Sequence, residues 1–271
     1  MTEKFAQRFQ EADKYAAYLR TTEGRLRFDL AWANFQRFLP AAADGKRVLD
    51  VGGGTGLFAV RLAELGFEVE VLDHSESMLA IAAAEANAKG LGNRISFRQG
   101  DAACLAAFFQ PASFHSVVCH NVLEYVEDPP AVVHGLARVL KKGHSSVVSL
   151  LVRNRSGEVL KAAIKGKDGQ QAQAVLVADT VLDSLYGMPT RLFDPAGVRT
   201  LVAAAGLKVV AENGVRVVSD YISNQTLTDD AYRQLVDLEL LLGAQPQFAA
   251  IARYTQVVGC TSQAAPAGRS E

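Results

Sequence analysis

Residues 46–73 carry apolar runs that predict a strand, a helix and a second strand in succession. The first run, Arg47 to Val51, stops at glycines, as a short buried strand does. Gly66 closes the next segment, whose apolar residues follow a helical spacing: Leu57, Val60, Leu62 and Leu65. The second run, Glu68 to Leu72, ends at Asp73. We therefore expect a βαβ unit whose first turn is rich in glycine.

Both periodicities continue to the end of the chain. Five further apolar runs are typical of strands: Arg94–Arg98, Phe114–His120, Ser146–Val152, Leu207–Asn213 and Tyr254–Cys260. Helical patterns lie before and between the strands: Thr2–Pro40, His74–Lys89, Val132–Leu140, Asp194–Gly206 and Asp229–Leu242. This alternation predicts one α/β domain over residues 1–260, without an internal repeat or a second domain.

Two segments do not follow these patterns. Residues 153–190 are the least regular part of the chain and contain glycines, glutamines and three lysines, so they predict a mobile or helical insertion. Insertions of this kind beside a sheet edge often recognise the substrate. Residues 261–271 have the composition of a disordered tail.

Composition narrows the class of protein. A chain of 271 residues with 49% hydrophobic and 21% charged residues can bury one sizeable core. Its formal net charge of −1 lacks the basic excess of many dedicated nucleic-acid binders. No signal peptide or membrane-spanning run is evident, which predicts a cytoplasmic protein. Without C-x-x-C spacing, the three cysteines predict buried free thiols rather than disulfides or a zinc site: Cys104, Cys119 and Cys260.

The glycine-rich turn is the first candidate for chemistry. Its pattern, with Gly53 as a further glycine, is Asp50-x-Gly52-x-Gly54-x-Gly56. Glycine permits positive φ and lets bare backbone approach a ligand. Asp73 at the end of the next strand can accept hydrogen bonds from both hydroxyls of a ribose. The glycines alone do not identify the ligand. A dinucleotide pattern is also present, Gly54-x-Gly56-x-x-Ala59, so a nicotinamide or flavin cofactor stays an alternative. A purely structural turn is another.

Four other residues have a binding interpretation beside a structural one. Met78 suits contact with an adenine ring or core filling. Asp101 can accept from an adenine amino group or cap a helix. His120 ends a predicted strand, where ligands of α/β sheets bind, so we favour ligand contact over a buried neutral histidine. Arg27 suits a cofactor carboxylate or a surface ion pair with Glu23, one helical turn away.

Asp50, two residues ahead of the first glycine, changes the interpretation of the glycine-rich turn. The turn resembles motif I of class I S-adenosylmethionine (AdoMet) methyltransferases, whose cofactor has an ammonium group and no pyrophosphate. Beyond this motif the chain is similar to the tRNA 5-carboxymethoxyuridine methyltransferase family. The matching pieces are Thr21-Thr22-x-Gly24-x-Leu26-Arg27, Val48-Leu49-Asp50-x-Gly52-Gly53-Gly54-x-Gly56, His120-x-Val122-Leu123-Glu124, Gly187-Met188-Pro189 and Gly214-Val215-Arg216-Val217-x-x-Asp220-Tyr221.

The resemblance implies a fold and a cofactor. The fold would be a Rossmann-like class I methyltransferase, with a mostly parallel seven-stranded sheet, helices on both faces and an N-terminal helical lid formed by residues 1–44. The cofactor would be AdoMet, giving S-adenosylhomocysteine, with no metal. The family's contacts fall here on Arg27, Gly52, Gly53, Asp73, His74, Ala102, Ala103 and His120. To these we add Asp50, Gly54, Gly56, Met78, Asp101 and Leu123.

The resemblance also implies methyl transfer to the carboxylate of a modified wobble uridine in the tRNA anticodon loop. A carboxylate is ionised near pH 7 and needs no general base. A guanidinium can orient it through two hydrogen bonds, and we predict Arg216 in this role with help from Tyr221. The alternative for Arg216 is a structural salt bridge with Asp220.

One departure keeps other functions open. The family pattern has a lysine cluster after Gly-Met-Pro, whereas residues 190–193 here carry one positive charge. Tyr125 stands where the family has tryptophan, and both can stack on a base. A methyltransferase acting on a small-molecule acid or phenol is the first alternative. A non-catalytic module that binds AdoMet or a nucleotide is the second.

Overall fold

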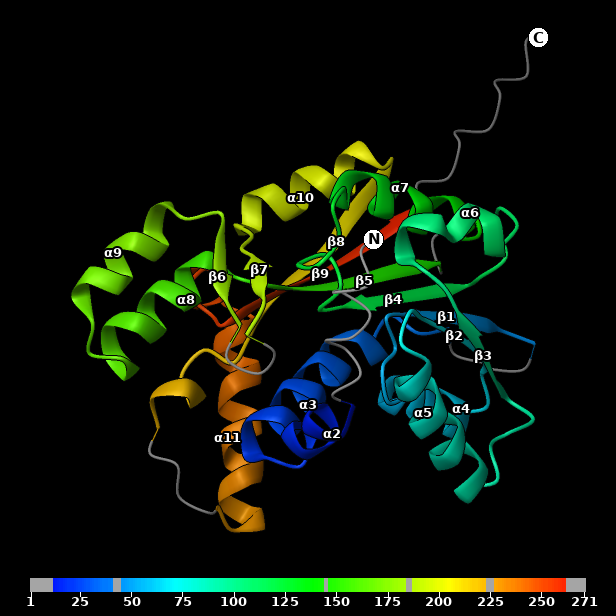
Figure 1. Cartoon of the computed structure of the whole chain (residues 1–271), viewed down its shortest axis with the longest axis horizontal. Helices are drawn as coiled ribbons and strands as arrows, with labels where there is room; N and C mark the ends of the chain where they lie inside the picture. The colour runs from blue at the N-terminus through cyan, green and yellow to red at the C-terminus, as the bar shows by residue number, and fades with distance from the viewer. Residues whose placement is uncertain (1–11, 41–44, 144–145, 184–186, 223–226, 262–271) are drawn as a thin grey trace, which may run out of the picture.

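Seven strands form one sheet. The computed structural model describes residues 12–40, 45–143, 146–183, 187–222 and 227–261. The strands are β1 Arg47–Val51, β2 Glu68–Asp73, β3 Ile95–Gln99, β4 Ser116–His120, β5 Val147–Arg153, β8 Leu207–Val215 and β9 Tyr254–Thr261. Their order is β3-β2-β1-β4-β5-β9-β8, and β9 runs antiparallel to both of its neighbours while the other pairs are parallel (Figure 1). This confirms the mostly parallel seven-stranded sheet.

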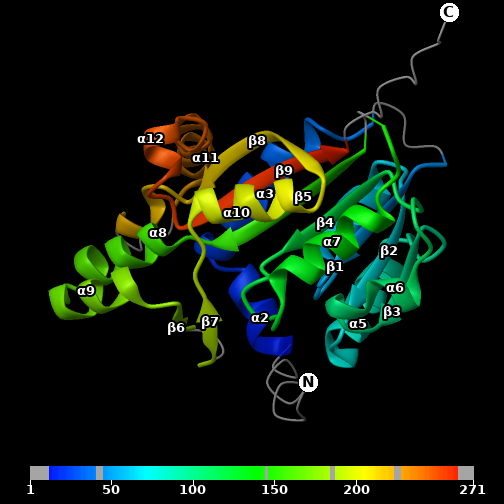
Figure 2. The same ribbon diagram turned by 90° about the horizontal axis from the view of Figure 1, so that it is seen from above.

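Helices cover both faces of this sheet. The main ones are α3 Thr22–Gln36, α4 Leu57–Glu64, α5 Glu76–Ala88, α6 Leu105–Phe108, α7 Pro129–Val139, α10 Pro195–Ala204 and α11 Asp229–Gly243, with a short α12 at Pro246–Ala249. Helices α6, α7 and α10 lie on one face, and α3, α4, α5 and α11 lie on the other (Figures 1 and 2). The β1 side chains alternate accordingly, since Val48 packs with the second group and Leu49 with the first.

The N-terminal helices divide into a core helix and a cover. Helix α2 spans Ala12–Leu19, and α3 begins after Thr21, whose hydroxyl accepts from Gly24 N. Helix α3 buries an apolar face that includes Leu26, Leu30, Ala31, Trp32 and Phe35. It is therefore part of the core, and in the described part of the predicted lid Tyr15 and Tyr18 of α2 and Glu23 and Arg27 of α3 line the cavity described below. Residues 1–11 and 41–44 lie outside the described residues.

Residues 153–190 are more regular than the sequence predicts. They form α8 Arg155–Leu160, a π-helical turn η2 at Lys161–Lys165, α9 Gly169–Val177, and a hairpin of β6 Thr180–Leu182 with β7 Pro189–Arg191. Asn154 and Asp168 cap α8 and α9 with their side chains. The helical alternative was correct. Helices α8 and α9 project beyond the core (Figure 1).

The ends of the strands differ slightly from the prediction. Strand β4 begins at Ser116 rather than Phe114. Strand β9 includes Thr261, which was predicted to begin the tail, because its buried hydroxyl accepts from Gly143 N at 2.9 Å. Residues 262–271 lie outside the described residues. The three cysteines are free thiols, as predicted, but only Cys119 and Cys260 are buried and Cys104 is exposed. No helix within the described ranges has the length and apolarity needed to cross a bilayer.

Candidate cofactor and acceptor site

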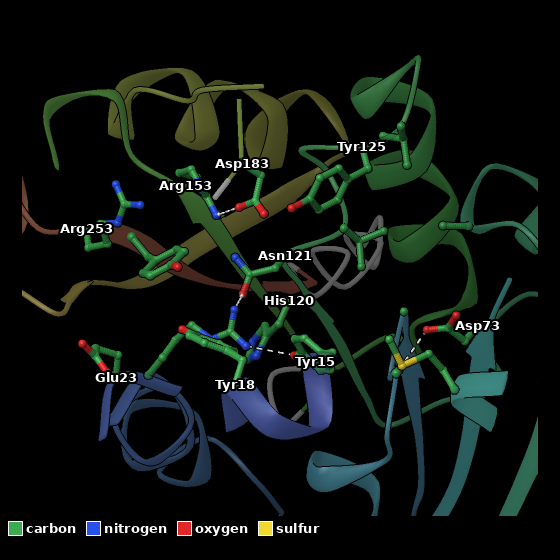
Figure 3. Close-up of a pocket in the computed structure, with 18 of the residues that line it drawn as sticks. Tyr15, Tyr18, Glu23, Asp73, His120, Asn121, Tyr125, Arg153, Asp183 and Arg253 are labelled. Carbon is green, nitrogen blue, oxygen red and sulfur yellow. Dashed lines mark hydrogen bonds and ion pairs between the residues drawn. The ribbon is translucent and has the colours of Figure 1, made fainter. Parts of the chain in front are cut away.

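A cavity of about 390 Å³ lies where the carboxyl ends of β1, β2 and β4 meet α2 and α3 (Figure 3). Ligands of open α/β sheets bind at this edge, and the volume suits a small molecule. Most of the predicted site residues line the cavity: Arg27, Gly52, Gly54, Asp73, His74, Met78, Asp101, Ala102, His120 and Arg216. Asp50 and Gly53 line an adjoining hollow of about 50 Å³, which shares Arg27, Gly52 and His120 with the main cavity.

Four predicted contacts do not reach the wall of either hollow. Gly56 packs α4 against α5, since a Cβ there would lie 2.8 Å from the Ala82 Cβ. Leu123 is fully buried in the apolar core. Ala103 donates its N–H to the Asp101 side chain as part of a helix start. Tyr221 follows the cavity residue Asp220 but is not a lining residue itself. Direct ligand contact at these four positions stays a prediction.

The glycine loop presents backbone to the cavity. Gly52 and Gly54 have φ of +68° and +54°, which an L side chain rarely adopts. A Cβ on Gly52 would lie 2.2 Å from the Val122 Cγ2, so only glycine fits there. Gly54 N donates to Asp73 Oδ2 at 2.9 Å, and Ser75 N donates to Asp73 Oδ1 at 2.8 Å. Asp73 thus fixes the loop, and each of its oxygens keeps a lone pair for a ribose hydroxyl.

Asp50 is a buried acid with an unused oxygen. Its Oδ2 has no hydrogen-bond partner among the described residues, and a Cβ on Gly53 would lie 2.7 Å from it. Burial, together with the charge of Asp73, raises the pKa of Asp50 to about 7. A cationic ligand group would satisfy this oxygen and restore its charge. The acid therefore fits an ammonium group and disfavours a pyrophosphate.

Arg27 points its guanidinium into the cavity. It donates to Asn121 Oδ1 at 3.0 Å and to Tyr15 Oη at 2.9 Å, and it lies 5.0 Å from the Tyr18 ring centroid (Figure 3). The guanidinium therefore contacts these three residues, and no ion pair joins it to Glu23 within the described α3. The ion-pair alternative was wrong, because the side chain turns from the helix surface toward the sheet.

His120, Met78 and Asp101 each line the cavity and also show the structural feature predicted for them. His120 lines the cavity and is also neutral, because burial and the nearby Arg27 lower its pKa to about 3. Met78 is 3% exposed yet contributes to the cavity wall. Asp101 lines the cavity while capping the 3-10 turn η1, Ala102–Cys104.

The opposite end of the cavity is built from paired arginines and acids. Arg153 bonds Asp183 at 2.6 Å (Figure 3) and Glu158 at 3.1 Å. Arg253 pairs with Glu158 and lies 3.3 Å from Asp220. These groups are all less than a tenth exposed. They form one continuous buried network, which we call the acceptor end.

Arg216 belongs to this network. It pairs with Asp220 and donates to Tyr18 Oη at 3.3 Å, with a left-handed backbone at φ +63°. The predicted salt bridge to Asp220 is confirmed, and the side chain also lines the cavity. Its Nε, like that of Arg153, has no hydrogen-bond partner in the described part of the chain. Buried N–H groups of this kind are available to an anionic ligand.

The charges of the ion-paired network balance. Three carboxylates, Glu158, Asp183 and Asp220, pair with Arg153, Arg216 and Arg253. Lys161 and Lys165 also line the cavity. Burial and the charge of Arg253 lower the pKa of Lys161, so a nearby anion would stabilise its charged form.

Sequence reasoning missed most of the acceptor end. Arg153, Asp183 and Arg253 are far apart in the chain, and no local motif joins them. Asn121 and Tyr15, which hold Arg27, were missed for the same reason. Only the position of Arg153 at the end of a strand, next to the predicted insertion, could have suggested it.

Similarity to known sequences agrees with this arrangement. A family profile described as a methyltransferase domain matches residues 48–143. The tRNA 5-carboxymethoxyuridine methyltransferase of Escherichia coli (strain K12) is 32% identical over 239 residues, which is 88% of this chain and 88% of that protein. A ubiquinone biosynthesis O-methyltransferase of Idiomarina loihiensis is 34% identical over 178 residues, 63% of this chain and 65% of that protein.

Similarity to solved structures concerns the fold. A SAM-dependent methyltransferase from Thermotoga maritima has a TM-score of 0.61 at 15% identity, covering 95% of this chain and 99% of that one. One from Mesorhizobium loti has a TM-score of 0.58 at 20% identity, covering 85% and 97%. The architecture is therefore the Rossmann-like methyltransferase fold.

Proposed function

The chain belongs to the tRNA 5-carboxymethoxyuridine methyltransferase family of AdoMet-dependent methyltransferases, and we propose that it methylates the carboxylate of 5-carboxymethoxyuridine at the tRNA wobble position. The products are the methyl ester and S-adenosylhomocysteine. The observation that carries this proposal is the acceptor end, where two buried arginines, Arg153 and Arg216, line the cavity with unpartnered Nε–H groups that suit one incoming carboxylate.

The glycine end holds the cofactor. Bound AdoMet supplies a methyl group activated by its sulfonium. Asp50 Oδ2 would accept from the ammonium group, Arg27 would attract the carboxylate, and Asp73 would accept from the ribose hydroxyls. Asp101 and Met78 would contact the adenine.

The acceptor end binds and orients the carboxylate. Arg216 and Arg153 donate through their unpartnered Nε–H groups, while Asp220 and Asp183 hold the two guanidinium groups in place. Tyr221 lies near Asp220 and Arg253, and burial raises its pKa to about 12, so it stays protonated. Catalysis then consists of alignment, with reacting atoms held at about 3–3.5 Å, and of the exclusion of water by α2.

A phenol acceptor fits less well, because it needs a general base. His120 has a pKa of about 3, lowered by burial and Arg27, so it is too weak a base near pH 7. A carboxylate acceptor avoids this requirement.

Contact with RNA falls on the rim of the cavity. Arg191, which follows Gly187-Met188-Pro189, donates to the carbonyl oxygens of Val126 and Glu127 and so offers little to a phosphate. Lys161 and Lys165 on η2 line the cavity instead. Tyr125 on the wall can stack on a base.

Nucleoside mass analysis tests the proposal. Transfer RNA from a strain lacking the gene should accumulate 5-carboxymethoxyuridine and lose its methyl ester relative to the parent strain. Unchanged wobble nucleosides, in a strain that makes the acid, would contradict the tRNA substrate. The candidate would then be a small-molecule acid, which the net charge of −1 and the tethered Arg191 favour.

A further inference from the structure

Four polar side chains from separate elements form a continuous hydrogen-bonded chain behind the cavity wall. Asn34 on α3 donates to Gln256 on β9 at 3.1 Å, and Gln256 bonds Ser149 on β5 at 3.1 Å. Ser149 Oγ lies 2.8 Å from the Nε2 of His120, the last residue of β4. Asn34, Ser149 and Gln256 are 4%, 0% and 1% exposed, so water cannot replace these bonds.

The direction of each bond follows from the backbone of α3. Gln256 Nε2 also donates to the carbonyl oxygen of Ala31 at 3.0 Å. A carbonyl only accepts, so this contact fixes which end of the Gln256 amide is the NH₂ group. Both of its N–H donors are then used, one on Ala31 and one on Ser149, and its oxygen accepts from Asn34.

The proton on Ser149 determines the state of His120. Ser149 Oγ accepts from Gln256, so its own proton needs an acceptor, and His120 Nε2 is the partner in reach among the described residues. Nε2 therefore accepts. A neutral imidazole with an accepting Nε2 carries its proton on Nδ1. The low pKa of His120, caused by burial and Arg27, keeps the ring neutral near pH 7.

The Nδ1–H that results is a buried donor without a partner within the described ranges. His120 lines both the main cavity and the adjoining hollow, beside Arg27 and Asn121. A buried unsatisfied donor is costly, and a ligand acceptor removes that cost. AdoMet and the proposed acceptor each bring a carboxylate to this cavity.

We propose that Ser149, Gln256 and Asn34 are positioning residues that hold His120 as its Nδ1–H tautomer, and that this N–H donates to a ligand carboxylate. The same chain ties α3, which carries Arg27, to the strand that carries His120. Two donors on different elements thereby keep a fixed separation. The tautomer does not depend on the proposed tRNA substrate. If AdoMet supplies the carboxylate, the ligand contact depends only on AdoMet binding. If the acceptor supplies it, the contact rests on the proposed function.

The tautomer is tested by ¹⁵N NMR of the histidine side chains near pH 7, with His120→Phe assigning the signals. We expect a protonated Nδ1 and an unprotonated Nε2 in the native protein. Ser149→Ala should shift the ring toward the Nε2–H form, and Ser149→Thr should restore the native signal. Ser116→Ala is the matched control, because Ser116 is also fully buried in a strand but its hydroxyl has no hydrogen-bond partner among the described residues. A native Nε2–H form, or an unchanged tautomer in Ser149→Ala, would overturn the proposal.

The ligand contact is tested by two additions to the same NMR experiment. Adding S-adenosylhomocysteine alone should move the Nδ1 signal if its amino-acid carboxylate is the acceptor. A shift that needs 5-carboxymethoxyuridine as well would assign the contact to the substrate carboxylate. No shift after either addition would overturn the contact. In the first case Ser149→Ala should weaken S-adenosylhomocysteine binding about fivefold, whereas Ser116→Ala should not.

Discussion

The two ends of the cavity are built in different ways. The glycine end uses backbone and short side chains from one continuous βαβ unit, and a single strand-turn-helix segment places Asp50, Gly52 and Gly54 together. The acceptor end uses charged side chains from β5, α8, the β6–β7 hairpin, the segment after β8 and the residue before β9. The first end depends on shape and the second on charge balance.

This difference teaches which part of the enzyme can change. A cofactor that never varies is held by local geometry that tolerates little substitution. An acceptor site made of separate ion pairs can be altered one residue at a time, and the relatives reported above include methyltransferases with different named substrates. We therefore expect mutations at the two ends to separate cofactor binding from acceptor binding.

The largest expected effect comes from Gly52→Ala. The new Cβ would lie 2.2 Å from Val122, on a backbone at φ +68°, so the loop must move. We expect S-adenosylhomocysteine binding, measured by calorimetry, to weaken about hundredfold, since overpacking costs about 1–3 kcal/mol. Gly90→Ala is the control, with φ +70° and nothing within 4 Å of its Cβ. Equal affinity in both variants would show that the tight approach at Gly52 is not needed.

The second prediction distinguishes a structural role of Arg216 from a role in binding the acceptor. Arg216→Met should destabilise the fold by about 3–5 kcal/mol in urea, because Asp220 loses a buried partner. Arg216→Met with Asp220→Leu should regain most of this stability, while KM for the acceptor stays raised about tenfold or more. Recovery of KM together with stability would reduce Arg216 to a structural residue.

Asp50 makes the glycine end sensitive to pH. Its folded pKa of about 7 lies above its unfolded value of 3.8, so its contribution to stability is complete below about pH 4 and is lost as the pH rises through 7. Asp50→Asn should therefore be more stable than the native protein at about pH 8, by on the order of 2–4 kcal/mol, and equal to it at about pH 4. The variant should also bind S-adenosylhomocysteine more weakly. A stability difference independent of pH in urea titrations would contradict this account.

The smallest effect concerns the rim. Lys165→Gln should lower the salt dependence of anticodon stem-loop binding by about 0.7 in the slope of log K against log[salt], as expected for one lost phosphate contact on a single strand. Lys208→Gln removes an exposed lysine on β8 and is the control. If both variants keep the native slope, the rim does not contact phosphate.

The sequence predicted the sheet and the glycine end well, because both follow from local periodicity and a contiguous motif. Asp73 and Gly52 could be placed from residue order alone. Arg153, Asp183 and Arg253 could not, since they meet only after β5, the hairpin and β9 are assembled. The depth of the N-terminal helices could not be predicted either, because the apolar face of α3 predicts a helix but does not say that Leu30 and Phe35 pack into the core.

The central claim is that the acceptor end recognises a carboxylate. Purified protein should be incubated with AdoMet and tRNA carrying 5-carboxymethoxyuridine, and the nucleosides analysed by mass before and after mild alkali. The account predicts a methylated wobble nucleoside that alkali returns to the free acid, as an ester requires. A methyl group that survives alkali, or no transfer to this nucleoside, would contradict it.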